Sequence, residues 1–275
     1  MTHTMELVST AQFRRSMARS VGFEAYMKRI ARLVSKLVNV GTKIEHPLFI
    51  PHESTKKALL FILTANNGLC GGYNAGVLRA ALDQFENLSK EYNEVELFVF
   101  GKRGISYLDY RGYEIARQFT EFDHNPAYEN VLVLANECLT RYKTGEIDRF
   151  DVVYSRFVSI SQQYPTAETL LPLSDSAIEN DEEGFDATEE QEYEFLPSPE
   201  SILEEVVPDA FRLKLFKCFL EAAVSEQVAR MMAMKAATEN ADSMISELTT
   251  MYNRVRQTQI TNEIIEVING AAALQ

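Results

Sequence analysis

The C-terminal quarter of the chain carries its longest uninterrupted hydrophobic pattern. Neither glycine nor proline occurs from Asp209 to Asn269, so this stretch can form one helix of about 90 Å at 1.5 Å per residue. Its apolar positions recur about every 3.5 residues, which is the period of a left-handed coiled coil. They are Leu220, Val224, Val228, Met231, Met234, Ala237, Ala241, Met244, Leu248, Met251 and Val255. Pro208 before this stretch and Gly270 after it predict the two helix ends.

A helix of this length cannot bury its apolar stripe against itself and needs a partner helix. The first part of the chain can supply one, because residues 1–39 carry apolar side chains spaced for one helical face. Gly22 is a weak point in that helix, and Gly41 and Pro47 predict its end. We therefore predict that residues 1–39 and 209–269 pair as antiparallel helices. An ordinary bundle of shorter helices is the alternative.

The middle of the chain alternates short apolar runs with helical patterns. Buried strands are predicted at Ala58–Thr64, Val95–Phe100, Asp151–Val158 and Thr166–Leu173, and helices at Ala75–Tyr92, Lys102–Tyr110 and Tyr128–Lys143. This alternation favours parallel strands joined by crossover helices. The sequence thus predicts an α/β fold in which a Rossmann-like domain, residues 56–207, is inserted between two coiled-coil segments, residues 1–45 and 208–275.

The distribution of charge along the 275 residues follows the same division into a first segment, a middle and a C-terminal segment. The net charge of -13 combines a basic first segment, with ten Lys and Arg against four Asp and Glu in residues 1–57, with an acidic middle. Residues 175–205 alone hold 13 Asp and Glu, which predicts a solvated, mobile loop, since no calcium-loop spacing is present. The chain is acidic overall and its basic residues share a helical pattern with apolar neighbours, so we expect no nucleic-acid partner.

Candidate chemistry is sparse. The glycine-rich turn Gly68–Asn74 lacks the lysine and hydroxyl with which a P-loop holds phosphate and magnesium, and it does not match a dinucleotide fingerprint. We interpret it as a tight strand-to-helix turn in which glycine permits positive φ. The four histidines are scattered and no Cys/His cluster has metal-ligand spacing, so neither a metal nor a cofactor is predicted.

Cysteine usage and hydropathy indicate where the protein works. Three cysteines, Cys70, Cys138 and Cys218, are an odd number without pairing or metal spacing, which predicts free thiols in a reducing compartment. No apolar run approaches the ~18 residues of a membrane span, and the N-terminal residues are polar where a signal peptide needs an apolar stretch. We expect a cytosolic protein, or one peripheral to a membrane on that side.

Three stretches resemble the gamma subunits of F-type ATP synthase. They are Thr4–Arg15, the turn with Gly68, Leu69, Cys70, Gly71 and Gly72, and the long segment Ser225–Leu274 that contains LTTMYNRVRQTQITNEIIEVINGAAAL. The resemblance implies a central-stalk rotor whose coiled coil stands inside a ring of alpha and beta subunits, with a foot that joins the epsilon subunit and the membrane c ring. It implies a non-catalytic subunit, peripheral to the cytoplasmic face of the bacterial inner membrane, that couples proton flow to ATP synthesis or hydrolysis.

The same resemblance implies which residues contact the ring. They are Met5, Arg254, Arg256, Gln257, Thr261 and Glu263. Their chemistry suits the role, because the arginine fork fits a partner carboxylate and a glutamine can donate and accept beside it. The four-residue spacing of Gln257 and Thr261 predicts that they share a helix face. The alternative is that these are ordinary exposed polar residues.

Two other classes of function stay open at this point. A soluble nucleotide-dependent enzyme would use the α/β domain and would bind nucleotide as an isolated chain. A coiled-coil adaptor without a motor role would form homodimers through residues 209–269.

Overall fold

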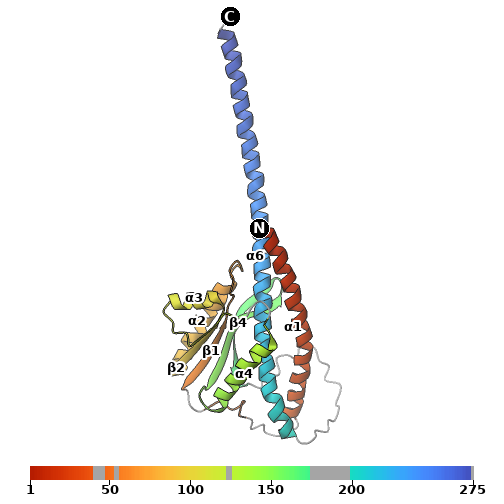
Figure 1. The fold of residues 1–275 in the computed structure, drawn as a ribbon, viewed down its shortest axis with the longest axis vertical. Coiled ribbons are helices and arrows are strands. Elements are labelled where there is room, and N and C mark those ends of the chain that lie inside the picture. Colours follow the sequence, from red (N-terminus) through yellow and green to blue (C-terminus); the bar gives the residue numbers. More distant parts are fainter. Residues whose placement is uncertain (40–46, 53–55, 122–125, 174–198, 274–275) are drawn as a thin grey trace.

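Two long helices run beside a smaller α/β domain, and the C-terminal helix extends far beyond it (Figure 1). The computed structural model describes residues 1–39, 47–52, 56–121, 126–173 and 199–273. The N-terminal helix, α1, spans Thr2–Asn39, and the C-terminal helix, α6, spans Pro199–Ala273. The predicted architecture, an α/β domain inserted between two long terminal helices, is confirmed.

The α/β domain is built on a five-stranded sheet. Its strands are β1 (Lys57–Leu63), β2 (Glu94–Phe100), β3 (Arg117–Phe119), β4 (Arg149–Ser159) and β5 (Gln162–Leu171), in the order β3-β2-β1-β4-β5. The first four strands are parallel, which was predicted for β1, β2 and β4. The prediction is wrong for β5, which pairs antiparallel with β4. Only Ile160 and Ser161 separate these two strands, whereas a parallel crossover needs a dozen or more residues.

Helices cover both faces of the sheet. Those of the α/β domain are α2 (Tyr73–Glu91), α3 (Lys102–Tyr110) and α4 (Tyr128–Lys143). Side chains alternate along β1, so that Leu59 and Phe61 face the core shared with α4 and α6, whereas Leu60 and Ile62 face the core shared with α2 and α3. A strand buried on both faces has a continuous apolar sequence, which is why β1 could be predicted.

Aromatic rings join α6 to the sheet. Phe61 lies at the centre, with its ring centroid 5.2 Å from that of Phe100 and 4.6 Å from that of Phe150. Phe100 in turn meets Phe219 of α6 edge-on at 5.0 Å, and Phe150 meets Phe211 of α6 at 5.8 Å. Aromatic pairs at such separations add to the stability that burial provides. The lower part of α6 therefore belongs to the core of the α/β domain.

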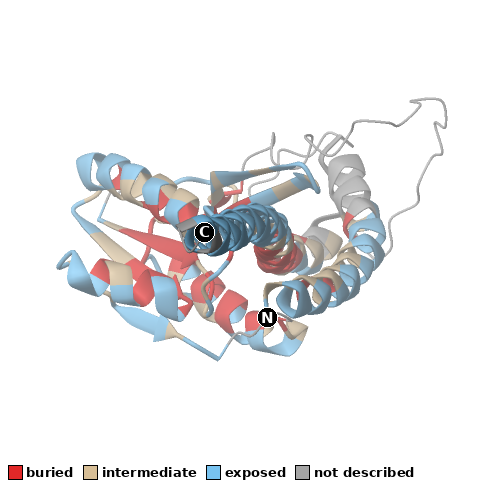
Figure 2. Ribbon diagram, turned by 90° about the horizontal axis from the view of Figure 1, so that it is seen from above, coloured by how far each residue is buried: buried red, intermediate tan, exposed pale blue. Residues whose placement is uncertain are grey.

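α1 packs antiparallel against the lower part of α6, which Figure 2 shows nearly end-on between α1 and the α/β domain. Phe23 meets Phe216 edge-on at 4.9 Å, and the hydroxyls of Thr2 and Thr238 lie 3.0 Å apart. Every residue of Glu239–Gly270 is exposed. We call Pro199–Thr238 the paired half of α6 and Glu239–Gly270 its projecting half.

The predicted pairing of residues 1–39 with 209–269 is therefore confirmed up to Thr238 and wrong beyond it. The reason is length: α1 has 38 residues and α6 has 75. At 1.5 Å per residue these helices span about 57 and 112 Å, so α1 can cover only half of α6.

Both predicted ends of α6 are also wrong. Pro208 lies inside the helix rather than before it. An interior proline costs about 3 kcal/mol or more, which the packing of its buried neighbours, such as Phe211, offsets here. Pro199 takes the first position instead, where its missing N–H would have no helical partner. Gly270 does not end the helix, which continues to Ala273.

Strand β3 was not predicted, because three residues carry too little periodicity. Gly22 does not interrupt α1. Within the acidic stretch 175–205, residues 199–205 form the first turns of α6, whereas residues 174–198 lie outside the described residues, so the mobility expected for them stays a prediction.

Candidate functional site

The glycine-rich turn joins the end of β1 to the start of α2. Leu69 has a φ of 62° and Gly71 a φ of 53°, so the turn uses left-handed backbone at one leucine and one glycine. Asn74 holds the turn closed, because its Oδ1 accepts the backbone N–H of Ala65 at 2.9 Å and its Nδ2 lies 3.1 Å from the Sγ of Cys70. The expected strand-to-helix turn is confirmed.

The turn lies against α6. Arg230 Nε donates a hydrogen bond of 3.3 Å to the carbonyl oxygen of Gly68, and its Nη2 lies 2.7 Å from Oε1 of Glu226, which is also buried. A Cβ on Gly71 would lie 3.7 Å from Cβ of Ala233, which is ordinary contact. Glycine is therefore favoured at position 71 by its positive φ and not by a lack of space.

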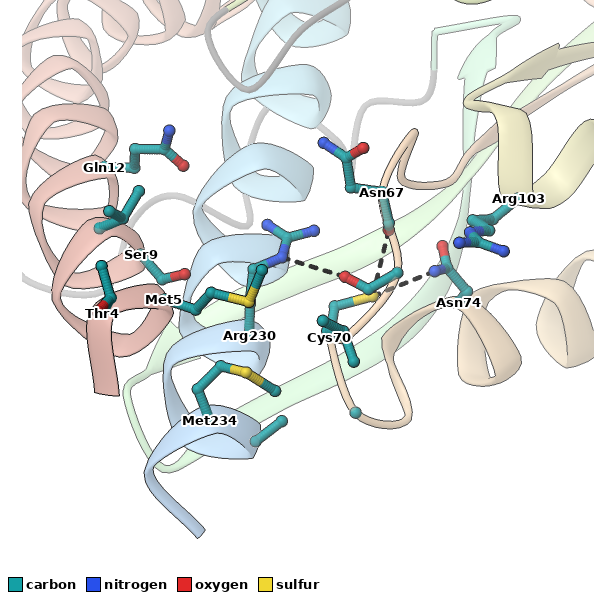
Figure 3. Close-up of a pocket in the computed structure, with 15 residues that line it drawn as sticks. Thr4, Met5, Ser9, Gln12, Asn67, Cys70, Asn74, Arg103, Arg230 and Met234 are labelled. Atoms are coloured by element: carbon teal, nitrogen blue, oxygen red, sulfur yellow. Dashed lines mark hydrogen bonds between the residues drawn. The ribbon is translucent and has the colours of Figure 1, made fainter. Parts of the chain in front are cut away.

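The N-terminal end of α1 completes an open pocket of about 1060 Å³ beside the turn (Figure 3). Its lining comes from segments that are far apart in the sequence: Thr4, Met5, Val8, Ser9, Gln12, Asn67, Gly68, Leu69, Cys70, Gly71, Asn74, Arg103, Arg230, Ala233 and Met234. The structure thus brings Met5 and the glycine-rich turn together, although each was singled out separately. Arg103, on α3, lies over Gly68, where a Cβ would be 3.1 Å from its Nη2.

Burial controls the titratable groups beside the pocket. Burial raises the pKa of the Cys70 thiol, and the nearby Arg230 guanidinium offsets this only in part. Burial also raises the pKa of Tyr73 well above its ordinary value, and the phenol donates to the carbonyl oxygen of Leu63 at 3.2 Å. A thiol with a raised pKa is protonated near neutral pH and is a poor nucleophile. The turn therefore offers no activated nucleophile.

The remaining predicted contact residues lie on the projecting half of α6, away from the pocket. All of them are exposed: Arg254, Arg256, Gln257, Thr261 and Glu263. Helix geometry puts Arg254 about 30 Å along the axis from Met234, which lines the pocket. Thr261 Oγ1 donates to the backbone oxygen of Gln257 at 2.8 Å, so these two residues share a face as expected. The predicted residues thus form two separate groups.

Large apolar side chains surround the second group. Exposed fractions of 48–72% are found at Ile260, Ile264, Ile265, Val267 and Ile268. Nearer the α/β domain, the stripe with coiled-coil spacing continues with exposed fractions of 60–64% at Met244, Leu248, Met251 and Val255. Soluble proteins rarely expose apolar side chains in such continuity unless a partner covers them. The projecting half is therefore an interaction surface.

Arg230 and Arg103, the two charged residues that line the pocket, were not among the predicted site residues. The four-residue spacing of Glu226 and Arg230 predicts their helical ion pair, 2.7 Å in the structure. No local signal could show that Arg230 also reaches Gly68, which is 162 residues away. Among the described residues, no group of three or more His, Cys, Asp or Glu is placed to hold a metal ion, and no helix is long and apolar enough to cross a membrane.

The sequence has close relatives over its whole length. A protein-family model described as ATP synthase matches residues 1–274. The ATP synthase gamma chain of Rhodopirellula baltica is 49% identical over 276 residues, which cover 100% of this chain and 93% of that one. The gamma chain of Staphylococcus aureus (strain JH9) is 33% identical over 274 residues, with the same coverage.

The fold is also found in solved structures. A chain in the cryo-EM structure of the Tetrahymena thermophila mitochondrial ATP synthase central stalk and c-ring has a TM-score of 0.59 at 17% identity, covering 86% of this chain and 99% of that one. A chain of the Euglena gracilis mitochondrial ATP synthase has a TM-score of 0.53, also at 17% identity, covering 96% and 95%. These likenesses establish a shared fold, and the full-length sequence matches go further: the chain belongs to the gamma-chain family of ATP synthase.

Proposed function

We propose that this chain is the central-stalk rotor of an F-type ATP synthase. It rotates inside a ring of alpha and beta subunits and so couples ion flow through a membrane sector to ATP synthesis or hydrolysis. One observation carries the proposal: α6 is anchored in a folded domain, yet its projecting half exposes apolar side chains along its whole length. The similar solved chains come from central-stalk and F1/c-ring assemblies, which supports the same setting here.

The shape suits a rotor. The α/β domain lies to one side of α6 (Figure 1), and a single helix projects from it, so the molecule has no threefold symmetry. Inside a ring with approximate threefold symmetry, each catalytic subunit therefore meets a different side of the helix. Contacts that differ between orientations stabilise different open and closed states at the three sites. Rotation of the helix then changes which catalytic site binds substrate, which carries out the reaction and which releases product.

The two groups of predicted residues have separate roles in this proposal. Arg256 and Gln257, supported by Arg254, Thr261 and Glu263, bind loops of the catalytic subunits deep in the ring, where an arginine fork suits a carboxylate. Met5 and the glycine-rich turn line the pocket some 30 Å lower and contact the mouth of the ring. Contacts at two heights resist tilting of the helix as well as guiding its rotation.

The chain itself is non-catalytic in this proposal. The glycine-rich turn has no P-loop lysine or hydroxyl, and burial keeps the Cys70 thiol protonated. The α/β domain instead binds the epsilon subunit and the membrane c ring, which places the protein at the cytoplasmic face of the bacterial inner membrane as a peripheral subunit.

Reconstitution tests the proposal directly. The full chain is co-expressed with the alpha and beta subunits of its own ATP synthase, and the purified complex is assayed for ATP hydrolysis. We expect one copy of the chain per three alpha and three beta subunits and a higher turnover than the ring alone. Failure to co-purify with the ring, or a turnover equal to that of the ring alone, would contradict the rotor assignment.

The isolated chain distinguishes the two other classes of function. Calorimetry with ATP and magnesium should give no binding; micromolar binding that a substitution at Gly71 or Gly72 abolishes would support a nucleotide-dependent enzyme. Sedimentation should give a monomer, whereas a stable dimer that is lost on substitution of Leu248 would support a coiled-coil adaptor.

A further inference from the structure

We propose that a row of polar contacts locks α6 against rotation within the α/β domain and so carries the torque between them. This inference rests on the proposed rotor function. The row consists of side chains on the paired half of α6, namely Lys214, Glu221, Ser225 and Arg230. From first to last they span about 24 Å of helix.

The first contact ties α6 to β5. Lys214 Nζ lies 3.0 Å from Oε1 of Glu168, and the other carboxylate oxygen accepts a hydrogen bond of 2.8 Å from the Tyr154 hydroxyl on β4. Lys214 and Glu168 are shielded, with side-chain exposures of 14% and 31%. A shielded, charge-assisted contact of this kind is stronger than a neutral hydrogen bond.

The next two contacts tie α6 to the backbone of β4. Glu221 Oε2 accepts the N–H of Phe157 at 3.4 Å, and Ser225 Oγ donates to the carbonyl oxygen of Ser155 at 2.9 Å. Ser225 is fully buried and Glu221 is nearly so. Lys214, Glu221 and Ser225 are spaced by seven and four residues, so they lie on one face of the helix.

The fourth contact reaches a different part of the domain. Arg230 donates to the carbonyl oxygen of Gly68 in the glycine-rich turn, while Glu226 holds the same guanidinium from within the helix. The first three side chains of the row therefore bind the β4–β5 hairpin, and the last, Arg230, binds the turn between β1 and α2. Contacts to two separate elements oppose rotation of α6 better than contacts to one.

Directionality is the physical reason for assigning torque to these contacts. The aliphatic contacts of α6 are non-directional, so these side chains let the helix turn slightly between the same neighbours at little cost. Hydrogen bonds weaken steeply when their angle falls toward about 120°. Because the α/β domain lies off the α6 axis (Figure 2), torque on the helix loads these bonds first.

The test compares two triple variants in the assembled complex. The first, Lys214→Met/Glu221→Leu/Ser225→Ala, removes three contacts; the second, Lys214→Arg/Glu221→Gln/Ser225→Thr, keeps the hydrogen-bonding groups. The ring is fixed to a surface and a bead is attached to the α/β domain through Tyr110→Cys, at a position that is 90% exposed. The three native cysteines are buried, so labelling can be selective.

The readout is the variance of the bead angle during pauses in rotation, which is inversely proportional to torsional stiffness. If the three contacts that the first variant removes supply about half of that stiffness, this variant should increase the variance about twofold. The second variant should remain close to the unmodified complex. Should the first variant fail to assemble, Ser225→Ala alone should still increase the variance measurably.

A matched control distinguishes a loss of torsional stiffness from a general loss of folding stability. Val228 is a fully buried apolar residue of the same helix, and Val228→Ala should lower the melting temperature without removing any polar contact. Equal variance in the first variant and the unmodified complex would overturn the inference, and so would an equal increase in Val228→Ala. If the unmodified complex does not rotate, the proposed function itself fails and this inference falls with it.

Discussion

The two halves of α6 follow one hydrophobic pattern but have opposite surroundings. In the paired half, residues such as Leu215, Leu220 and Val224 are at most 2% exposed, because α1 and the sheet cover them. In the projecting half, Leu248 and Val255 continue the same spacing and are 62% and 60% exposed. Nothing within the described parts of the chain covers these two side chains.

The two halves show that a hydrophobic pattern specifies the need for a partner, whereas the fold decides whether this chain supplies one. A heptad stripe specifies a helix that needs a partner; it does not specify whether the partner lies in the same chain. The paired half finds its partner in α1 and the sheet. No described residue of this chain covers the projecting half, and in the function proposed above its partner is the ring.

Truncation after Thr238 should give the largest difference between the halves. Removing residues 239–275 deletes the exposed side chains of Glu239–Gly270, so the melting temperature of the remainder should change little. The same truncation should abolish stimulation of ring ATP hydrolysis. Scanning calorimetry and a steady-state ATPase assay measure the two effects. A large drop in melting temperature would show that the projecting half is structurally part of the fold.

A matched pair of leucine substitutions should give the next largest effect. Leu215→Ala removes a fully buried side chain and should lower the free energy of unfolding by about 2–5 kcal/mol. Leu248→Ala, at a site that is 62% exposed, should change it by less than about 0.5 kcal/mol. Urea denaturation of the isolated chain measures both. Similar losses for the two variants would mean that Leu248 is covered in solution, for example by a second copy.

Arg256→Ala and Gln257→Ala should lower the ATP turnover of the complex without changing the stability of the isolated chain. Both residues are exposed in the isolated chain, so each variant should unfold like the unmodified protein, within about 0.5 kcal/mol. In the assembled complex we expect ATP turnover to fall by up to about tenfold, which corresponds to 1.4 kcal/mol of lost stabilisation. Thr250→Ala, on the same exposed helix, serves as the control. Full turnover and coupling in both variants would remove these residues from the proposed contact.

The smallest expected effect is a pH dependence of stability that arises where Glu168 of β5 meets Lys214 of the paired half. Burial by itself would raise the pKa of Glu168, but the Lys214 ammonium and the hydrogen bonds from Lys214 and Tyr154 hold it below its ordinary value. The stability that this provides is complete above the unfolded pKa of about 4.3 and is lost as the pH falls through the folded pKa.

Glu168→Gln should therefore flatten the acid side of a plot of unfolding free energy against pH, below about pH 4.3. Glu247→Gln, in the projecting half, provides the matched control and should leave that plot unchanged. Urea titrations between about pH 3 and 6 give the curves. An unchanged acid limb in Glu168→Gln would mean that Lys214 does not stabilise this carboxylate in solution.

Local pattern predicted most of the fold. The bounds predicted for Lys102–Tyr110 and Tyr128–Lys143 are those of α3 and α4, because apolar periodicity and flanking turn residues set them locally. The antiparallel direction of β5 was missed, although the predicted strands Asp151–Val158 and Thr166–Leu173 already lay too close together for a parallel crossover. The start of α6 was predicted wrongly at Pro208, because tertiary packing outweighs the tendency of proline to interrupt a helix.

The candidate site was predictable only in pieces. The glycine-rich turn has a local sequence signal, and it does form the expected turn. The pocket depends on Met5, Gly68 and Arg230 coming together from three segments, which no local pattern can show. For the projecting half, the sequence indicated exposed polar residues among apolar ones, but the relative lengths of α1 and α6 were needed to show that no described residue covers it.

The projecting half also has a consequence for the life of the protein before assembly. Helices without tertiary contacts are marginal in water, so this half should open locally far more often than the rest of α6. Proteases cleave such transiently opened segments in proportion to how often they open. A copy of the chain made in excess of its ring is therefore the copy most exposed to degradation. The apolar surface proposed to bind the ring would thus also keep the number of rotors matched to the number of rings.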